Sequence, residues 1–190
     1  MNAGRTPLFL PDLDDLEYLH CHCIVGTPGV GPVEFETGEY ETALICTRGR
    51  AFLTTHDESY ELGVCDVLYV PRRSDIRVDA DGNGCELLEV SAPVNHDYPV
   101  RHTLFAEALS CANGADALLL EGGEESGRLS VGITRGAGLS DPPSGAERLQ
   151  LPIDLPQELG VGDRGTLWVV ASREERRAAG RVGPTLVDLE

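Results

Sequence analysis

A series of short strand-like segments between residues 33 and 71 places the strongest constraint on how this chain can fold. The segment V-E-F-E at 33–36 precedes the turn T-G-E, and a longer, largely apolar run over 40–55 is interrupted at Arg48-Gly49. An Arg-Gly interruption of this kind predicts a hairpin corner. After the turn H-D-E-S, residues 60–71 predict one further strand. Short strands at this spacing indicate a small antiparallel barrel.

The strand series continues on both sides of this stretch. Residues 17–25 alternate in period two and end at the turn signal G-T-P-G-V-G-P. Residues 76–80 alternate as well, D-G-N-G at 81–84 predicts a turn, and 85–93 closes the series. The chain has 22 Gly and 12 Pro but only five Tyr, four Phe and one Trp, which favours many turns. The predicted fold class is all-β, a jelly roll or another closed barrel.

The chain divides into three regions. Residues 1–16 predict an irregular arm, in which Asp12, Asp14 and Asp15 are candidate caps of a short helical turn. Residues 17–112 form the barrel, and its last part predicts an extended crossing and then a helical turn. Residues 113–190 hold four strand-like segments and the helix-like R-E-E-R-R-A-A-G. This half either extends the barrel or forms a second half-barrel that packs on the first.

The charge and the cysteines exclude several classes of partner. The net charge is -17 and all 15 basic residues are Arg, so the surface repels nucleic acid and anionic lipid. No window is apolar enough for a membrane span or a signal peptide. Six Cys without a C-x-x-C pair fit a reducing cytoplasm and free thiols. A disulfide framework is the alternative, because six is an even number.

Two histidines form the one pattern typical of a metal site. The alternation over 17–25 places His20 and His22 on one face of a strand and Cys21 and Cys23 on the other. Two imidazoles on one face can share a metal ion, which makes this pair a weak metal candidate. No third ligand follows at a suitable spacing, so histidines on a half-exposed strand face are the competing interpretation. No His or Cys occurs after Cys111.

Several phrases resemble a known family. They are T-G-E-Y-E at 37–41, Y-E-L-G at 60–63 with D-V-L-Y-V-P-R at 66–72, S-A-P at 91–93, and Y-P-V-R at 98–101. In this order they resemble the cupin superfamily, and more narrowly the first lobe of the 5-deoxy-glucuronate isomerases of inositol catabolism and the related 5-keto-4-deoxyuronate isomerases. The resemblance covers about residues 17 to 105. It implies a cupin-type jelly-roll barrel and makes residues 113–190 a candidate for a degenerate second cupin half.

The resemblance also implies a metal site, from which this chain departs. Family members hold a metal, usually zinc, in the second lobe through H-x-H, a Glu and a later His. The positions that match the general cupin pattern in the first barrel read Glu34, Glu36 and Glu41, with Ile76 in place of the last His. Three carboxylates would suit Mg²⁺, Ca²⁺ or Mn²⁺ rather than zinc. Alternatively, Glu34 and Glu36 lie on a solvated face at the barrel mouth.

Arginine residues near the end of the second strand block are candidates for binding a ligand. Arg72 and Arg73 could hold a sugar carboxylate with a bidentate fork, or they could pair with Asp75 at a turn. Tyr69 joins them as a ligand-binding candidate, and Glu41 is the candidate catalytic base.

Three functional hypotheses follow. The first is a cupin related to uronate isomerases that has lost its metal site and acts as a small-molecule-binding or structural barrel, with a small sugar acid as ligand. No cofactor is expected in that case, although a divalent metal is possible. The second is an active aldose-ketose isomerase of carbohydrate catabolism. In it, Glu41 is the base, and the metal is held either by His20 and His22 or by the glutamates. The third is an interaction module that packs on a second copy as a homodimer.

Overall fold

The computed structural model describes residues 4–8, 17–112, 116–123, 126–134, 146–156 and 164–173. Its elements are β1 (Gly4–Pro7), β2 (His20–Gly26), β3 (Val33–Glu36), β4 (Tyr40–Thr55), β5 (Glu58–Leu62), β6 (Val67–Val70), β7 (Asp75–Pro93), β8 (Arg101–Thr103), α1 (Phe105–Cys111), β9 (Asp116–Leu120), β10 (Leu129–Thr134), β11 (Ala146–Asp154) and β12 (Arg164–Ser172). The all-β expectation is therefore confirmed. Within these residues, no helix is long and apolar enough to cross a membrane.

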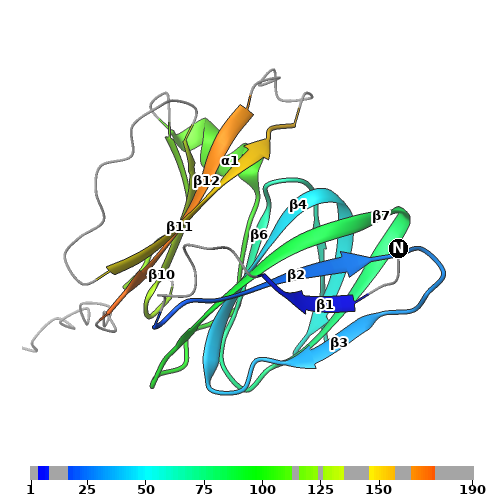
Figure 1. Ribbon diagram of the computed structural model, residues 1–190, viewed down its shortest axis with the longest axis horizontal. Coiled ribbons are helices and arrows are strands. Elements are labelled where there is room, and N and C mark those ends of the chain that lie inside the picture. Colours follow the sequence, from blue (N-terminus) through cyan, green and yellow to red (C-terminus); the bar gives the residue numbers. More distant parts are fainter. Residues whose placement is uncertain are drawn as a thin grey trace, which may run out of the picture.

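The first eight strands form a barrel built on two long, bent strands (Figure 1). Strand β7 pairs with β4 along most of its length, and the sheet order is β1-β2-β7-β4-β6-β8, with β3 on β7 and β5 on β4. The inward face is apolar over most of the barrel. The buried residues of this barrel core are Ile24, Leu44, Cys46, Ala51, Leu53, Leu62, Leu68, Val70, Ile76, Val78, Cys85 and Leu87.

Two expected turns are instead bends within β4 and β7. The register of β4 against β7 shifts around Arg48, yet pairing continues on both sides, so no hairpin forms at Arg48-Gly49. The D-G-N-G segment likewise lies inside β7 and does not reverse the chain. Gly49 has a φ of 72°, and a Cβ there would lie 2.1 Å from the carbonyl oxygen of Gly84. Close backbone approach at this glycine lets both strands bend together.

The expected strand over 60–71 is divided into β5 and β6 by a turn. Cys65 has a φ of 72°, and the carboxylate of Asp66 accepts the backbone N–H of Gly63 at 2.8 Å. The other oxygen of Asp66 accepts the N–H of Phe105 at 2.8 Å, at the start of α1. Asp66, which belongs to one of the phrases that carried the family resemblance, is therefore a structural residue. Helix α1 confirms the helical turn expected after the crossing segment.

The N-terminal arm is partly a strand. Residues 4–7 form β1, which pairs antiparallel with β2, so the irregular structure expected there is wrong. Most of β1 is exposed, so its sequence lacks the alternation of apolar and polar residues that predicted β2. Asp12, Asp14 and Asp15 lie outside the described residues, as does nearly all of the expected helix over 173–180.

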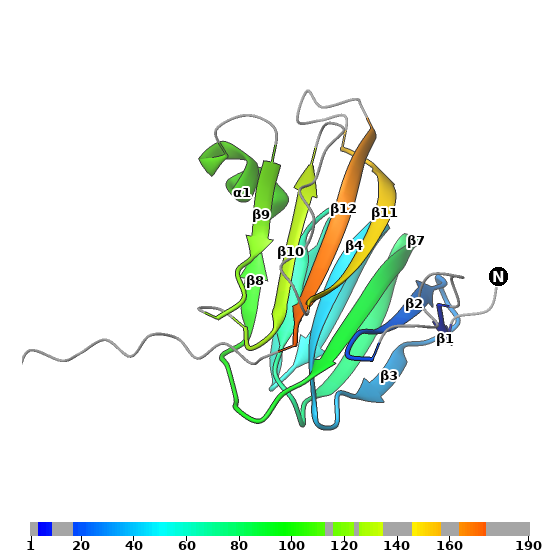
Figure 2. The ribbon, with the colours of Figure 1, turned by 60° about the vertical axis from the view of Figure 1, so that its left-hand side comes forward.

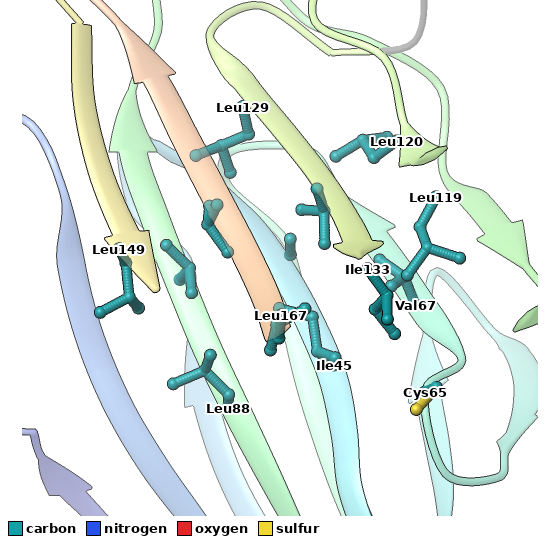
Figure 3. Packing of buried hydrophobic residues seen from close by; sticks show 14 of the residues in the cluster. Ile45, Cys65, Val67, Leu88, Leu119, Leu120, Leu129, Ile133, Leu149 and Leu167 are labelled. Carbon is teal, nitrogen blue, oxygen red and sulfur yellow. The ribbon is translucent and has the colours of Figure 1, made fainter. Parts of the chain in front are cut away.

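The four strands expected in the C-terminal half form a second sheet, in the order β11-β12-β10-β9. This sheet lies against the outer face of the barrel (Figures 1 and 2). Figure 3 shows Leu167 and Ile133 of the second sheet near Ile45 and Leu88 of the barrel, within one buried apolar cluster. Residues 41–46 of β4 are consequently buried on both faces, between the barrel core and this sheet.

Candidate functional site

The inward face of the barrel changes from apolar to polar toward the end where β2 begins. On β2, Ile24 belongs to the barrel core, whereas His22 and His20 continue the same face toward the opening. On β7, Glu89 lies opposite His22, and Ser91 lies opposite His20. A cavity of about 170 Å³ opens here, lined by Arg5, His20, His22, Glu36, Thr37, Tyr40, Glu89 and Ser91. We call it the mouth pocket.

An ion pair between the partly exposed Arg5 and the buried Glu89 lines the mouth pocket. Glu89 is only 1% exposed, and its carboxylate accepts two hydrogen bonds from Arg5, from Nε at 2.6 Å and from Nη2 at 2.7 Å. The guanidinium of Arg5 also lies over the ring of Phe35, 4.7 Å from its centroid. The hydrogen bonds from Arg5 to Glu89 raise the pKa of the guanidinium. The bidentate geometry fixes both side chains.

An imidazole lies beside this ion pair. Nδ1 of His22 is 3.6 Å from a carboxylate oxygen of Glu89 and 3.3 Å from Nη2 of Arg5. Burial lowers the pKa of His22, and the charges of Arg5 and His20 act in the same direction, while Glu89 opposes them. His22 is therefore neutral at neutral pH. Since a guanidinium can only donate, Nδ1 accepts the hydrogen bond from Arg5.

Hydroxyl groups and an aromatic ring complete the site. The hydroxyl of Ser91 donates to Glu89 at 3.3 Å and lies 2.9 Å from the hydroxyl of Thr42. Tyr40 makes an edge contact with His20, with ring centroids 5.0 Å apart. The mouth pocket thus offers donors and acceptors around an aromatic side chain, an arrangement suited to a small hydroxylated ligand.

The three predicted glutamates do not form one oxygen set. Glu34 is exposed on the outer face and pairs with Arg77 at 2.9 Å. Glu36 is exposed at the rim of the mouth pocket. Glu41 lies on the opposite face of β4 from the inward-facing Thr42, and Ile76 is part of the barrel core. The hypothesis of a three-carboxylate metal site is therefore wrong.

Glu41 instead connects the barrel to the second sheet. Its carboxylate accepts the backbone N–H groups of Gly127 at 2.7 Å, Arg128 at 2.6 Å and Leu129 at 3.1 Å, and the hydroxyl of Tyr69 at 3.0 Å. Glu41 and Tyr69 are both fully buried. Burial raises the pKa of Glu41, although these hydrogen bonds act against that rise. Neither residue lines the mouth pocket, so neither can act there as a base or a ligand contact.

The predicted arginines and the histidine pair also lack the arrangement of a metal or anion site. Arg73 forms a bidentate, exposed pair with Glu39, and Arg72 bonds Asp97 and Glu39; neither arginine lines the mouth pocket. Among the residues that the structure describes, no group of three His, Cys, Asp or Glu is placed to hold a metal ion. His20 and His22 do share one face, as predicted. The metal chemistry implied by the resemblance does not fit these residues.

Sequence reasoning missed Arg5, Glu89 and Ser91. A signal existed for Glu89, because an acidic residue that interrupts the apolar run L-L-E-V-S in a strand requires a buried partner. No pattern in the residues around Arg5 indicates that it belongs to a site. It reaches the site through a strand pairing that only the fold creates.

Comparisons with known proteins agree with this architecture. No protein-family model matches the chain, and no curated protein does. A solved structure of oxalate decarboxylase is similar over 94% of this chain and 75% of its own, with a TM-score of 0.61 and 12% identity. The E. coli protein Ylba is similar over 92% of this chain and 76% of its own, with a TM-score of 0.56 and 13% identity.

A cupin 2 domain-containing protein from Halorhodospira halophila aligns with 53% of this chain and 69% of its own, at 18% identity and a TM-score of 0.41. The fold is an all-β, cupin-type jelly roll with an added β-rich half. At these identities, the similarity extends to the fold and not to the activity.

Proposed function

We propose that the protein is a cupin-fold small-molecule-binding protein related to the uronate isomerases, and that it binds a small sugar or sugar acid in the mouth pocket without a metal. The main support for this proposal is the concentration of polar side chains at one end of an otherwise apolar barrel interior. Buried polar groups are costly, so a cluster of them beside a cavity favours a binding role over a purely structural one.

The dimensions and donors of the pocket support a ligand of this class. A cavity of about 170 Å³ suits a ligand of monosaccharide size or less, since drug-sized ligands occupy about 300–1,000 Å³. Arg5 donates to Glu89 through Nε and Nη2. The N–H groups of Nη1 are then the ones that can donate to a carboxylate or hydroxyl group of the ligand. Ser91 and Glu36 offer hydroxyl and carboxylate contacts to further hydroxyls.

Ligand binding is tested by thermal unfolding and calorimetry with D-glucuronate, D-galacturonate and D-glucose, each in the presence of EDTA. A ligand at tenfold its Kd stabilises the folded state by about 1.4 kcal/mol, which raises Tm by about 3–5 °C for a chain of this size. The His22→Gln variant should weaken binding, whereas Arg77→Gln on the outer face should not. Millimolar sugars that leave the wild-type Tm unchanged, or equal affinity in the His22→Gln variant, would refute the proposal.

One observation favours a second function, aldose-ketose isomerisation. A neutral imidazole beside a buried carboxylate at a cavity is a typical acid–base arrangement, and His22 and Glu89 have it. Because Nδ1 of His22 accepts from Arg5, its proton lies on Nε2, so Glu89, rather than Glu41 or His22, would be the base. Glu89 would remove a proton from the hydroxyl-bearing carbon beside the carbonyl and return it to the carbonyl carbon, while Nε2 of His22 would pass the proton of that hydroxyl to the carbonyl oxygen. Incorporation of deuterium from D₂O into that position of a uronate, lost in His22→Gln, is the expected signature. Absence of exchange in every sugar tested would leave binding as the function.

A further inference from the structure

A second cavity adjoins the mouth pocket. It has a volume of about 640 Å³ and lies where β3 and β4 end and β7 begins. Glu36, the last residue of β3, lines both cavities. Phe35 lines the second cavity, and the guanidinium of Arg5 from the mouth pocket lies over its ring. We call this second space the rim cavity. A ligand in the mouth pocket that extends past Glu36 would enter it.

A buried hydroxyl group without a partner lies at the rim cavity. Thr55, the last residue of β4, lines the cavity and is only 2% exposed. Among the residues that the structure describes, its hydroxyl has no hydrogen-bond partner. A buried polar group that is left unpaired is costly. A bound molecule that supplies the partner would remove this cost, so the hydroxyl indicates that the cavity holds a polar ligand.

The other available groups of the rim cavity are hydrogen-bond acceptors. The carboxylates of Glu36, Asp57 and Asp75 line it, and none of them has a hydrogen-bond or ion-pair partner within the described part of the chain. Arg73 and Arg77, which also line it, already form ion pairs with neighbouring carboxylates. Carboxylates accept hydrogen bonds from sugar hydroxyls, and three negative charges repel an anion. The rim cavity therefore favours a neutral ligand that is rich in hydroxyl groups.

The backbone around the rim cavity is held in place by hydrogen bonds. In the turn between β4 and β5, His56 has a φ of 50° and Asp57 a φ of 62°, and Nε2 of His56 lies 2.8 Å from the hydroxyl of Ser74. Arg73 has a φ of 58°, and its backbone N–H donates to the carbonyl oxygen of Gly38 at 2.6 Å. Residues other than Gly rarely adopt a positive φ, so these contacts fix an unusual backbone. A cavity that is already formed loses little entropy when a ligand binds.

We propose that the rim cavity is a second sugar subsite, and that the ligand is a neutral oligosaccharide. Its terminal ring enters the mouth pocket, and its next ring lies in the rim cavity beyond Glu36. This inference rests on the proposed function, because it concerns the neighbouring part of the same ligand. The mouth pocket, at about 170 Å³, holds one ring, whereas the rim cavity, at about 640 Å³, has room for at least one more. The three carboxylates disfavour an oligomer of sugar acids.

The test is calorimetry with sugars of one and two rings. Wild type should bind cellobiose or maltose at least about tenfold more tightly than D-glucose, the change that about 1.4 kcal/mol of added contacts produces. Digalacturonate should bind no more tightly than D-galacturonate. Thr55→Val removes the unpaired hydroxyl and Asp75→Asn removes a negative acceptor, so each should lower the ratio of disaccharide to glucose affinity several-fold. Asp154→Asn makes the same change at an exposed position of β11 and should keep the wild-type ratio.

Thermal unfolding of Thr55→Val separates binding from folding. Its hydroxyl has no partner in the free protein, so its loss should not lower Tm, and a reduced ratio at an unchanged Tm reports the subsite. The second subsite is refuted, and the proposed function stands, if D-glucose binds and neither neutral disaccharide binds more tightly. The same holds if the gain persists in both variants, or if digalacturonate gains as much as cellobiose. If no sugar of one or two rings binds, the proposed function fails and this inference fails with it.

Discussion

Replacement of Glu41 by Ala should uncouple the second sheet from the barrel. The substitution removes the acceptor of three backbone N–H groups, those of Gly127, Arg128 and Leu129, at a fully buried position. A buried donor left without a partner costs about 1–3 kcal/mol. Three such donors at the lower value give a loss of about 3 kcal/mol in the free energy of unfolding. We use the lower value because the variant no longer buries a carboxylate.

Two milder substitutions give the expected order of effects. Glu41→Gln keeps one carbonyl oxygen for Arg128 and Leu129, and its amide can donate to the Tyr69 oxygen, so only the Gly127 N–H loses its acceptor. Its cost should be about 1–2 kcal/mol. Tyr69→Phe removes a single hydroxyl bond from Glu41 and should cost about 1 kcal/mol.

The assay is urea unfolding followed by two probes. Trp168 on β12 is the single tryptophan, so its fluorescence reports the second sheet, while far-ultraviolet circular dichroism reports all strands. In Glu41→Ala the fluorescence transition should occur at lower urea than the dichroism transition. A loss in the free energy of unfolding below about 1 kcal/mol in Glu41→Ala would refute the reasoning. A loss in Tyr69→Phe that exceeds the loss in Glu41→Ala would refute it as well.

The same residue gives a pH dependence of defined sign. Burial raises the pKa of Glu41, so the folded state binds more protons than the unfolded state between the ordinary value and the raised one. The contribution of Glu41 to stability is therefore full below the unfolded pKa and declines as pH rises through the folded pKa. Glu41→Gln lacks this titration, and its deficit relative to wild type should be larger near about pH 4 than near about pH 8.

Three further outcomes are expected. Gly132→Ala should lower stability by about 1–3 kcal/mol and shift Trp168 emission, because the new Cβ would lie 2.2 Å from the indole ring; unchanged emission would contradict this contact. Ellman's reagent at pH 8 should react rapidly with the exposed Cys111 but not with the buried Cys46, whose pKa burial raises to about 12; rapid reaction at Cys46 would disprove its burial. Glu34→Ala should change stability by less than about 1 kcal/mol, because its pair with Arg77 is exposed; a larger loss by urea unfolding would indicate a structural role.

The sequence by itself determined the fold class and the place of most strands. Period-two alternation located β2, and the turns G-T-P-G-V-G-P and T-G-E separated β2, β3 and β4. The alternation also placed His20 and His22 on one face, where the structure has them. These features are local, since each depends on side chains within one strand.

Only the tertiary structure decided which residues form the site. Glu41 and Thr42 must lie on opposite faces of β4, but the second sheet buries both faces over 41–46, so no polar face marks the outside. The sequence therefore could not tell that Thr42 faces inward and Glu41 faces the second sheet. The pair of Arg5 and Glu89 joins residues 84 positions apart, through the pairing of β1 with β2 and of β2 with β7. Contacts of this range arise from strand order, which local patterns do not contain.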